Sequence, residues 1–311
     1  MSSAPEFGVV ILNWNNAEDT LACLSSLRSA DPLPRYAVVV DNGSVDSSLA
    51  DIRRWGREQN VTGEDGARPW LTVIAAGDNC GFAGGTNLGI RYLESRSEVT
   101  HILLLNNDAT ITPRFFTDIA NAIGRCPNAG LIGPTILESG DGGDVWYAGG
   151  VEHPLRALYT HSYEVPGSDE PVPTDFVTGC AMVISRALLE RIGPLAECYF
   201  PAYWEDGEYS FRARHAGFPV VYAPAARVYH KVGATVRAAG LDLVLARAKN
   251  RLRVFYVRRN YRGWTKVMAC GYLAVTKPGR AAIEAIKGRP RLGLAILQGT
   301  FTGFISREAN R

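Results

Sequence analysis

Short apolar runs rich in β-branched residues alternate with helix-like stretches over the first third of the chain, and this alternation restricts the fold more than any other feature. The apolar runs are bounded by turn residues and cover 8–12, 36–40, 71–75 and 102–105. Residues with helical spacing lie between them, at 17–29, from about residue 44, and at about 86–95. Continuous apolar strands separated by helices are typical of a parallel sheet covered on both faces. The sequence therefore predicts an α/β fold with a mostly parallel sheet flanked by helices.

Each of the four predicted strands is followed by Asn or Asp. These polar positions are Asn13, Asp41, residues 78–79 and residues 106–108. In sheets of this kind, ligands bind outside the carboxyl ends of the strands. We therefore expect a single polar rim that binds a ligand.

The pattern changes after this first part. A helix is expected at about 115–124, and a Gly- and Pro-rich stretch covers 138–173. That stretch either carries loops that face a second substrate or is a plain connection, and the sequence leaves both open. A further apolar run at 176–184 continues the sheet, and a helix follows at 188–192. Amphipathic helical patterns close the chain at 241–259 and 283–304.

Composition limits the class of protein. The 311 residues are 46% hydrophobic and 21% charged, which suits one large folded domain with a smaller appendage. A net charge of +2 is too small for nucleic-acid binding to be the main activity. Lys and Arg nevertheless gather from Arg237 onward. We expect that basic region either to meet a membrane surface or to pack on the large domain or on a second copy of the chain, as in a homodimer.

The six cysteines and the N-terminus bear on location. The cysteines lack zinc-like spacing, so reduced thiols are expected. The N-terminus has no charged segment followed by an apolar one, and no uncharged stretch approaches the roughly 20 residues that cross a bilayer. We expect a cytoplasmic protein, with peripheral attachment to the inner face of the cell membrane as its form of membrane contact.

Two acids at strand ends are candidates for binding a nucleotide and a cation. Asp41 is placed to accept a hydrogen bond from a pyrimidine N–H, although a turn Asp that caps the next helix has the same pattern. Asp108 closes an Asn-Asn-Asp triplet and offers oxygen to Mg²⁺ or Mn²⁺. One acid is sufficient because phosphates and water fill the other ligand positions. A capped turn is the alternative at Asp108 as well.

The segment 79–87, Asn-Cys-Gly-Phe-Ala-Gly-Gly-Thr-Asn, is predicted to be a glycine-rich turn between a strand and a helix. Its glycines would let the backbone approach a ligand, and its amides would face negative charge. The spacing differs from a dinucleotide fingerprint, and no Lys makes it a phosphate-binding loop. A turn without a ligand is the alternative.

Adjacent acids at Glu205 and Asp206 form the most specific segment. They follow a run of aromatic residues and precede a helix. The simplest interpretation is that their negative charges stabilise the N-terminus of that helix through its dipole. Aromatic flanks would instead shelter one carboxylate and raise its basicity, which a base for an alcohol requires. We predict that Asp206 is the base and that Glu205 binds the acceptor or orients the segment. His230 is a candidate ligand that would complete the cation site, although a lone His is usually structural.

With these motifs assembled, the chain resembles glycosyltransferase family 2 over nearly its full length, and within it the bacterial rhamnosyltransferase-like branch that builds cell-surface polysaccharides. The matching positions are Asn13, Asp41, 79–89, 106–108, 178–184, 205–212, His230 and 249–251. The triplet reads Asn-Asn-Asp where many relatives carry Asp-x-Asp, which lowers the expected metal affinity. The resemblance implies a GT-A fold with a Rossmann-like sheet, inversion at the anomeric carbon, and dependence on Mg²⁺ or Mn²⁺.

The resemblance also implies roles for individual residues. Asp206 and Glu205 would be catalytic, and Asp108 and His230 would hold the metal. Thr178 and Gly179 would line the donor sugar, although a buried strand start explains them equally. The expected donor-binding residues are Asn13, Asp41, Asn79, Ala83, Asn87, Asn107, Asp108, Thr178 and Gly179.

The implied organisation is a GT-A catalytic domain at 1–236 with a C-terminal helical extension at 237–311. The catalytic domain would divide into a nucleotide-sugar half at about 1–112 and an acceptor half at about 113–236. The expected donor is a dTDP- or UDP-sugar, with rhamnose favoured, and the acceptor is a cell-surface glycan or a lipid-linked saccharide. Two alternatives stay open: an inactive nucleotide-sugar-binding scaffold of the same fold, and a nucleotidyltransferase or oxidoreductase on a related sheet.

Overall fold

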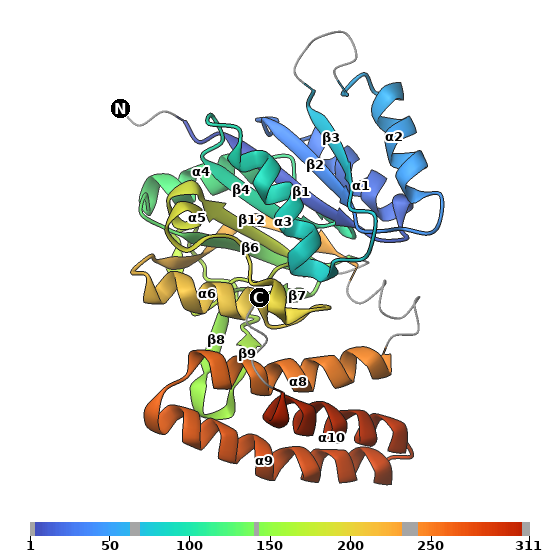
Figure 1. The fold of residues 1–311 in the computed structure, drawn as a ribbon. Helices are drawn as coiled ribbons and strands as arrows, with labels where there is room; N and C mark the ends of the chain where they lie inside the picture. Colours follow the sequence, from blue (N-terminus) through green and yellow to red (C-terminus); the bar gives the residue numbers. More distant parts are fainter. Residues whose placement is uncertain (1–3, 63–68, 140–142, 232–241, 307–311) are drawn as a thin grey trace.

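The computed structural model describes residues 4–62, 69–139, 143–231 and 242–306. A large sheet with helices on both faces occupies most of the molecule, and a group of three helices lies at one end of it (Figure 1). This arrangement confirms the predicted α/β fold with a C-terminal helical extension. The predicted boundary between residues 236 and 237 lies outside the described residues.

The described strands form one ten-stranded sheet and one separate hairpin. The order in the large sheet is β10-β12-β6-β11-β4-β1-β2-β3, with β5 beside β12 and β7 beside β6. The strands of the large sheet are β1 (Phe7–Asn13), β2 (Tyr36–Asp41), β3 (Leu71–Ala75), β4 (His101–Asn106), β5 (Ala109–Ile111), β6 (Leu131–Glu138), β7 (Val145–Tyr147), β10 (Val172–Pro173), β11 (Ala181–Ser185) and β12 (Val220–His230). The hairpin consists of β8 (Gly150–His153) and β9 (Leu158–His161).

Helices cover both faces of the large sheet. The first core contains side chains of α1, α2 and α4, and the second contains side chains of α3, α5 and α6. These helices are α1 (Ala17–Arg28), α2 (Ser48–Glu58), α3 (Gly81–Glu94), α4 (Phe115–Arg125), α5 (Arg186–Ile192) and α6 (Glu205–His215), and two short 3₁₀ helices are η1 (Pro154–Arg156) and η2 (Glu197–Tyr199). The C-terminal helices are α8 (Asp242–Asn260), α9 (Gly263–Ile286) and α10 (Pro290–Ile305).

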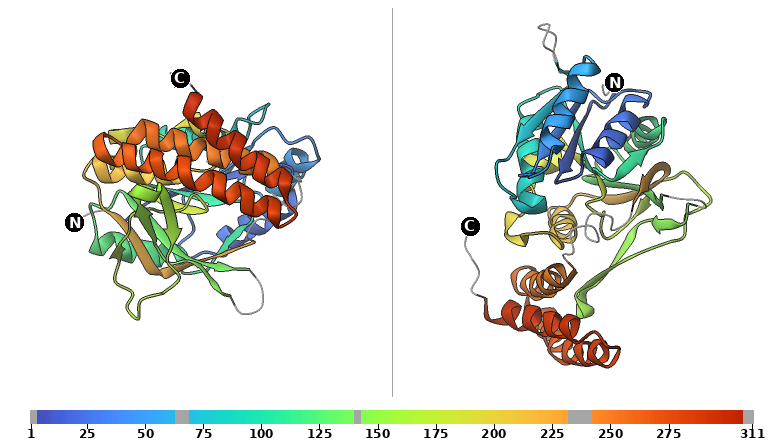
Figure 2. Two further views of the ribbon diagram at one scale, coloured as in Figure 1. Left: turned by 90° about the horizontal axis from the view of Figure 1, so that it is seen from below. Right: turned by 90° about the vertical axis from the view of Figure 1, so that its right-hand side faces the viewer.

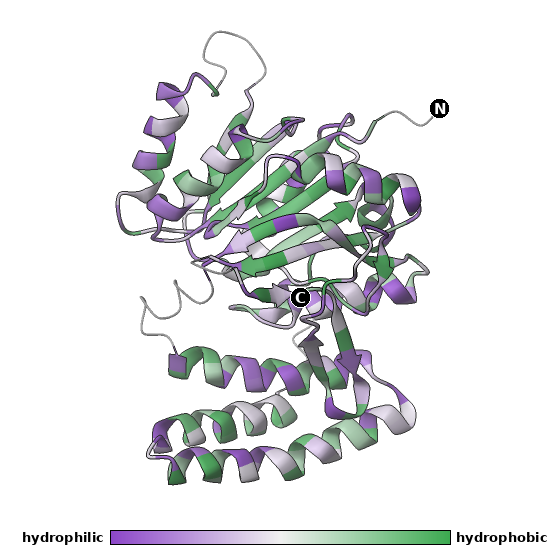
Figure 3. Ribbon diagram, turned by 180° about the vertical axis from the view of Figure 1, so that it is seen from behind, coloured by the Kyte–Doolittle hydropathy of each residue, from purple (hydrophilic) through white to green (hydrophobic). Residues whose placement is uncertain are grey.

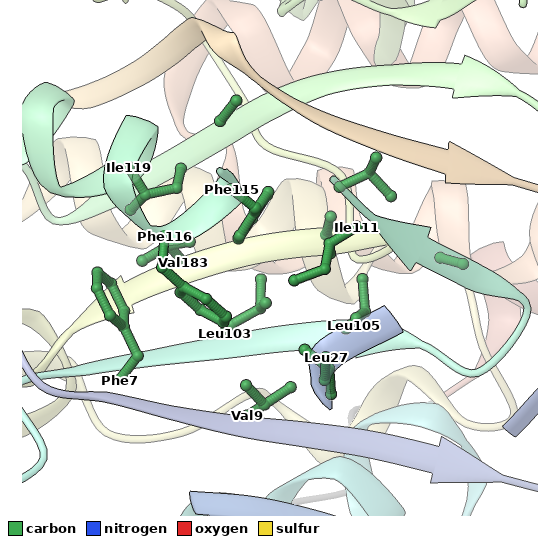
Figure 4. Packing of buried hydrophobic residues seen from close by; sticks show 14 of the residues in the cluster. Phe7, Val9, Leu27, Leu103, Leu105, Ile111, Phe115, Phe116, Ile119 and Val183 are labelled. Carbon is green, nitrogen blue, oxygen red and sulfur yellow. The ribbon is translucent and has the colours of Figure 1, made fainter. Parts of the chain in front are cut away.

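The two cores follow from the alternation of side chains along each strand. Val9 of β1 packs into the first core, whereas its neighbour Val10 packs into the second. In the first core, strand residues such as Leu103 meet Phe115 and Phe116, whose rings lie 5.2 Å apart at 88° (Figure 4). Each such buried side chain stabilises the fold by about 1.5–3 kcal/mol. Burial on both faces explains why these strands are continuous apolar runs.

The register of the sheet brings the polar strand ends to one rim. β1 pairs in parallel with β2, so Asn13 lies opposite Asp41, and with β4, so Leu12 lies opposite Asn106. β2 and β3 are parallel as well. β11 then runs antiparallel between β4 and β6, and β6 is parallel to β12. The first four strands thus end together, as predicted.

The segment 79–87 differs from its prediction. The helix starts at Gly81 instead of near residue 86, so most of the glycines lie inside α3. A Cβ at Gly85 would meet Leu12 Cδ1 at 2.5 Å, and one at Gly89 would meet Val10 Cγ1 at 2.5 Å. These glycines therefore allow α3 to pack closely on β1, which outweighs their low helix propensity.

Two later regions are also more ordered than predicted. The stretch expected to be loops or a plain connection contains β7, the β8–β9 hairpin and β10. At the C-terminus, α9 was not expected, and the pattern at 283–304 is divided by a turn in which Gly288 has φ +77° and Pro290 starts α10. Among the described residues, no helix is long and apolar enough to cross a membrane.

Candidate active site

Asp108 and His230 come together through the pairing of β5 with β12. Asp108 lies in the turn that follows β4, and the antiparallel register places Ala109 opposite His230. The Lys231 amide donates to the Asp108 carbonyl at 3.0 Å, which fixes this turn against the end of β12. The carboxylate Oδ1 of Asp108 lies 3.1 Å from Nε2 of His230, and both side chains are buried.

This pair fits a divalent cation. Apart from the contact of Asp108 Oδ1 with His230 Nε2, neither Asp108 Oδ1 nor His230 Nδ1 has a polar partner among the described residues, and buried polar atoms normally form hydrogen bonds. Adjacent ligands of an octahedral cation, each about 2.1 Å from it, lie about 3 Å apart. The described part of the chain holds no cluster of three or more His, Cys, Asp or Glu side chains that would bind a metal. A cation here would therefore keep positions for phosphate oxygens and water.

Asp206 is held at the start of α6 by backbone amides. Its Oδ2 accepts from the Gly179 N–H at 3.1 Å, and its Oδ1 accepts from the Gly207 N–H at 2.7 Å. The two residues before the acids, Tyr203 and Trp204, have φ of 81° and 79°. Bulky residues rarely adopt this left-handed region, and such strain concentrates at functional sites. The half-buried Asp206 carboxylate is thus fixed in direction at a strained helix start.

Glu205, the other acid of the pair, is buried inside the protein. Only 6% of the residue is exposed, and its Oε2 has no partner among the described residues. Burial, and then the charge of Asp206, raises the pKa of Glu205 to about 8. The carboxyl group that is sheltered from water is therefore Glu205, whereas the prediction assigned that shelter to Asp206. This position suits the orienting role expected for Glu205 better than contact with an acceptor.

The cation pair and Asp206 share one region of the rim. Gly179 bonds to Asp206, while the charge of Asp108, after burial, raises the pKa of the next residue, Cys180. On the other side, the Trp146 ring lies 5.1 Å from the His230 ring and 4.5 Å from the His161 ring. Burial lowers the pKa of His161, and the charge of Asp206 opposes that shift. The segment of Gly179 and Cys180 and the rings of Trp146 and His161 therefore connect Asp206 with the Asp108–His230 pair.

Sequence reasoning missed some residues of this region. Trp146 lies on β7 and His161 ends β9, both within the stretch that was expected to be substrate-facing loops or a plain connection. Lys249 of α8 is also close, because the charge of Asp206 opposes the lowering of the Lys249 pKa by burial. The aromatic residues and His in this Gly- and Pro-rich stretch were the signal that could have identified the first two.

Several predicted donor-binding residues are engaged in hydrogen bonds within the protein. The Asn13 amide donates to Asp41 Oδ1 at 2.8 Å, and its oxygen accepts from Thr20 at 2.8 Å. Asp41 Oδ1 also accepts from the Ser44 hydroxyl at 2.6 Å, and Oδ2 accepts from the Ser44 amide at 3.2 Å. Asn13 and Asp41 therefore build the turn after β2. The alternative interpretation is right about the turn but not about the helix cap, because α2 has Ser47 as its N-cap.

Other predicted donor residues tie α3 and β4 to neighbouring segments. Asn87 bonds to both backbone groups of Leu195, and Asn79 accepts from the Gly81 amide at 2.9 Å. Asn107 donates to the Thr20 hydroxyl at 3.1 Å. Ala83 is buried in the second core. Thr178 is buried beside Gly179, at the segment that holds Asp206. Of the predicted donor-binding residues, Asn79 alone is exposed.

Comparison with known proteins identifies the family of the chain. Residues 5–256 match the model of a protein family described as glycosyltransferase like family 2. The chain belongs to that family. A hexosyltransferase of low-salt glycan biosynthesis from Haloferax volcanii is 29% identical over 67% of this chain and 62% of its own length. An N-acetylglucosaminyl-diphospho-decaprenol L-rhamnosyltransferase from Mycobacterium tuberculosis is 25% identical over 82% of this chain and 85% of its own length.

Solved structures show the same fold. A mannosyltransferase from Pyrobaculum calidifontis, in complex with GDP-Man and Mn²⁺, has a TM-score of 0.58 at 17% identity, covering 99% of this chain and 89% of that one. Residues 1–349 of TarS from S. aureus, in complex with UDP-GlcNAc, have a TM-score of 0.57 at 15% identity, covering 95% and 81%. The expectation of a family 2 glycosyltransferase with a GT-A fold is confirmed.

Proposed function

We propose that this glycosyltransferase moves a sugar from a nucleoside diphosphate sugar to an acceptor hydroxyl, with inversion and with the help of a divalent cation. The observation that carries the proposal is the pairing of Asp108 with His230 next to the segment that holds Asp206. A cation pair and a fixed carboxylate at one sheet rim meet two needs of the reaction, which are neutralising a diphosphate and removing a proton.

Asp206 is the proposed base. Its carboxylate removes the proton of the acceptor hydroxyl as that oxygen attacks the anomeric carbon. The amides of Gly179 and Gly207 each donate to one of its oxygens, so the direction of the remaining lone pairs is fixed before substrate binds. Glu205 lies behind it in the interior and supports the start of α6.

Asp108 and His230 are the proposed ligands of Mg²⁺ or Mn²⁺. The bound cation would neutralise negative charge on the diphosphate leaving group. The nucleoside would lie toward the turn after β2, where Asp41 Oδ2 accepts one hydrogen bond from the protein and keeps a lone pair for a pyrimidine N–H. Asn13, Asn87 and Asn107 support this region through the protein bonds described above, while Asn79, Ala83, Thr178 and Gly179 border the donor.

The sugar and acceptor are proposed from the relatives. Rhamnose, from a dTDP- or UDP-sugar, is favoured because the Mycobacterium tuberculosis relative is named an L-rhamnosyltransferase. The same name describes an acceptor sugar linked through diphosphate to decaprenol, so a lipid-linked saccharide is the favoured acceptor class. Such an acceptor places the reaction at the cytoplasmic face of a membrane.

A thermal-shift series tests the donor and the cation together. The purified protein is melted with each of a panel of nucleoside diphosphate sugars, with Mg²⁺, with Mn²⁺ and with EDTA. A ligand at about 100 times its Kd stabilises the folded state by about 2.7 kcal/mol, which raises the Tm by several degrees. We expect stabilisation by one thymidine or uridine diphosphate sugar only with metal. Stabilisation without product formation would favour the inactive scaffold, and no response to any donor would contradict the proposal.

A further inference from the structure

The side of α9 and α10 that faces away from the helical core is apolar and exposed. Trp264, Val275 and Ile286 of α9 are 73%, 76% and 85% exposed. They are spaced by eleven residues, or about three helical turns, so they lie on one side of the helix. On α10, Leu294 and Phe301 are 54% and 64% exposed and lie about two turns apart. We call these five side chains and Val267, which is 60% exposed, the outer face.

The outer face lies at the end of the molecule far from the sheet. The opposite side of α9 contributes Ala269 and Leu273 to the core shared with α8. Seen from below, α9 and α10 lie side by side in front of the rest of the chain (Figure 2). Figure 3 shows hydrophobic residues along these two helices as well as in the sheet strands. A monomer in water rarely exposes so many large apolar side chains on one surface.

The C-terminal helices α8, α9 and α10 together carry a net positive charge, whereas the rest of the chain is net negative. Residues 242–306 contain 13 Lys and Arg against two acids, while the rest of the chain contains 20 Lys and Arg against 29 acids. One of the two acids, Glu284, is buried and paired with Arg280 and Arg289. Arg262, Lys287 and Arg291 are exposed at the ends of α9 and α10, beside the outer face. Apolar side chains bordered by uncompensated cations are typical of helices that lie in a membrane interface.

We infer that the outer face of α9 and α10 binds the surface of a lipid bilayer that carries anionic headgroups. The apolar side chains enter the boundary between headgroups and acyl chains, and the basic residues at the helix ends contact lipid phosphates. A second copy of this chain is a poorer occupant, because Arg262, Lys287 and Arg291 beside the outer face would come close to the same cations of the copy and repel them. The matched family model ends within α8, at residue 256, so it does not include this face.

The docked helices would fix the orientation of the catalytic domain relative to the membrane. α8 packs between them and the site: the Trp204 indole donates to the Lys249 carbonyl at 3.1 Å, next to the acids of α6. The inference does not depend on the proposed sugar or acceptor, because it rests on the exposed side chains and the charge alone. A binding measurement without donor, metal or acceptor therefore separates it from the proposed function.

Vesicle flotation tests the inference on the full chain. We expect binding to phosphatidylcholine vesicles that contain 30% phosphatidylglycerol, weaker binding in 0.5 M NaCl, and little binding to phosphatidylcholine alone. The double variant Trp264→Glu/Val275→Glu should lose at least tenfold in binding. The control variant Leu33→Glu/Tyr163→Glu changes apolar residues that are 43% and 64% exposed elsewhere, and it should bind like the wild type. All variants are first shown to melt within a few degrees of the wild type.

Three results would overturn the inference. The first is that the wild type does not float with anionic vesicles. The second is that the outer-face variant binds as well as its control. The third comes from sedimentation velocity: a dimer that the outer-face variant dissociates would make this surface an interface between two copies of the chain. A second variant, Lys287→Gln/Arg291→Gln, checks the charge contribution, and it should weaken binding to anionic vesicles several-fold while leaving the Tm unchanged.

Discussion

Two groups of buried polar side chains in the catalytic domain differ in how much of their hydrogen-bonding capacity the protein itself satisfies. The first group, Asn13, Asp41 and Asn87, is buried and bonds to other parts of the protein. The second group, Asp108 and His230, is equally buried but keeps an oxygen and a nitrogen without a hydrogen-bond partner among the described residues. In the first group, Asn13 and Asp41 hold two strand ends together and Asn87 ties α3 to Leu195, whereas the second group retains the capacity to bind a ligand.

The contrast extends to the adjacent acids of α6. Asp206 is half-buried and its oxygens accept from two backbone amides, while Glu205 lies inside with a free oxygen and a raised pKa. The position of a polar residue at a strand end or a helix start therefore does not show whether the residue supports the fold or takes part in the reaction. Two properties separate supporting residues from reacting ones: how many hydrogen bonds the protein makes to the side chain, and how exposed that side chain is to solvent.

Replacing Asp206 with Asn should produce the largest effect on turnover. The amide keeps an acceptor oxygen for one of the two glycine amides but cannot take the acceptor proton, so kcat should fall by about 10²–10⁴-fold. Transfer is measured with a labelled donor at saturating acceptor, and donor-dependent stabilisation should persist. Asp51→Asn, an isosteric change on α2, is the control and should keep wild-type turnover. Equal kcat for both variants would contradict the assignment of the base.

Removing a proposed cation ligand should have the next largest effect. Asp108→Asn keeps the shape of the side chain but loses its charge, so we expect Mn²⁺ affinity in the presence of donor to fall roughly tenfold or more. Without metal, the Tm should change little, since Asn keeps an oxygen or an amide near His230 Nε2 while the substitution removes a buried charge. Isothermal titration with Mn²⁺ measures the affinity. If both Asp108→Asn and His230→Gln bound Mn²⁺ with the wild-type affinity, the proposed metal site would be wrong.

The sequence predicts the parallel part of the fold well because its signal is local. Each of the first strands is an apolar run, and β1, β2 and β4 are buried on both faces, as β1 shows with Val9 in one core and Val10 in the other. The rim follows directly, because parallel strands end on one side. The meeting of Asp108 with His230 is less local: the residue types, and then the resemblance to a family, made both candidate cation ligands, but only the β5–β12 pairing shows how the two come together.

Contacts between distant segments could not be predicted from the pattern. The glycines of α3 suggest a loop until the close approach of β1 is known, since Gly89 leaves room for Val10. Trp146 and His161 reach the site only because β7 pairs with β6 and β9 with β8. The sequence also does not indicate which of two adjacent acids is buried, because the left-handed Tyr203 and Trp204 set that direction.

Asn87→Ala tests the supporting group, and its effect should fall on stability alone. The change removes the amide that hydrogen-bonds to the backbone N–H and C=O of Leu195. The free energy of unfolding should therefore fall by about 1–3 kcal/mol. Urea denaturation measures this loss, and kcat per folded molecule should stay near the wild-type value. The exposed Asn121→Ala on α4 is the control and should be close to neutral. A large loss of kcat with unchanged stability would place Asn87 in direct contact with substrate.

The smallest expected effect is a change in pH dependence from Glu205→Gln. The pKa of Glu205 is about 8 in the folded chain against an ordinary value of 4.5, so between these values the folded state holds a proton that the unfolded state has released. Rising pH therefore favours unfolding from about pH 4.5 to about pH 8, and this contribution levels off above that range. Glu205→Gln cannot ionise, so its stability should fall less between pH 6 and pH 9, as measured by urea unfolding at each pH. The control is Glu190→Gln, a change at an exposed residue, which should keep the wild-type dependence of the free energy of unfolding on pH. If Glu205→Gln showed that same dependence, Glu205 would be ionised over the whole pH range. Two negative charges would then lie side by side at the start of α6.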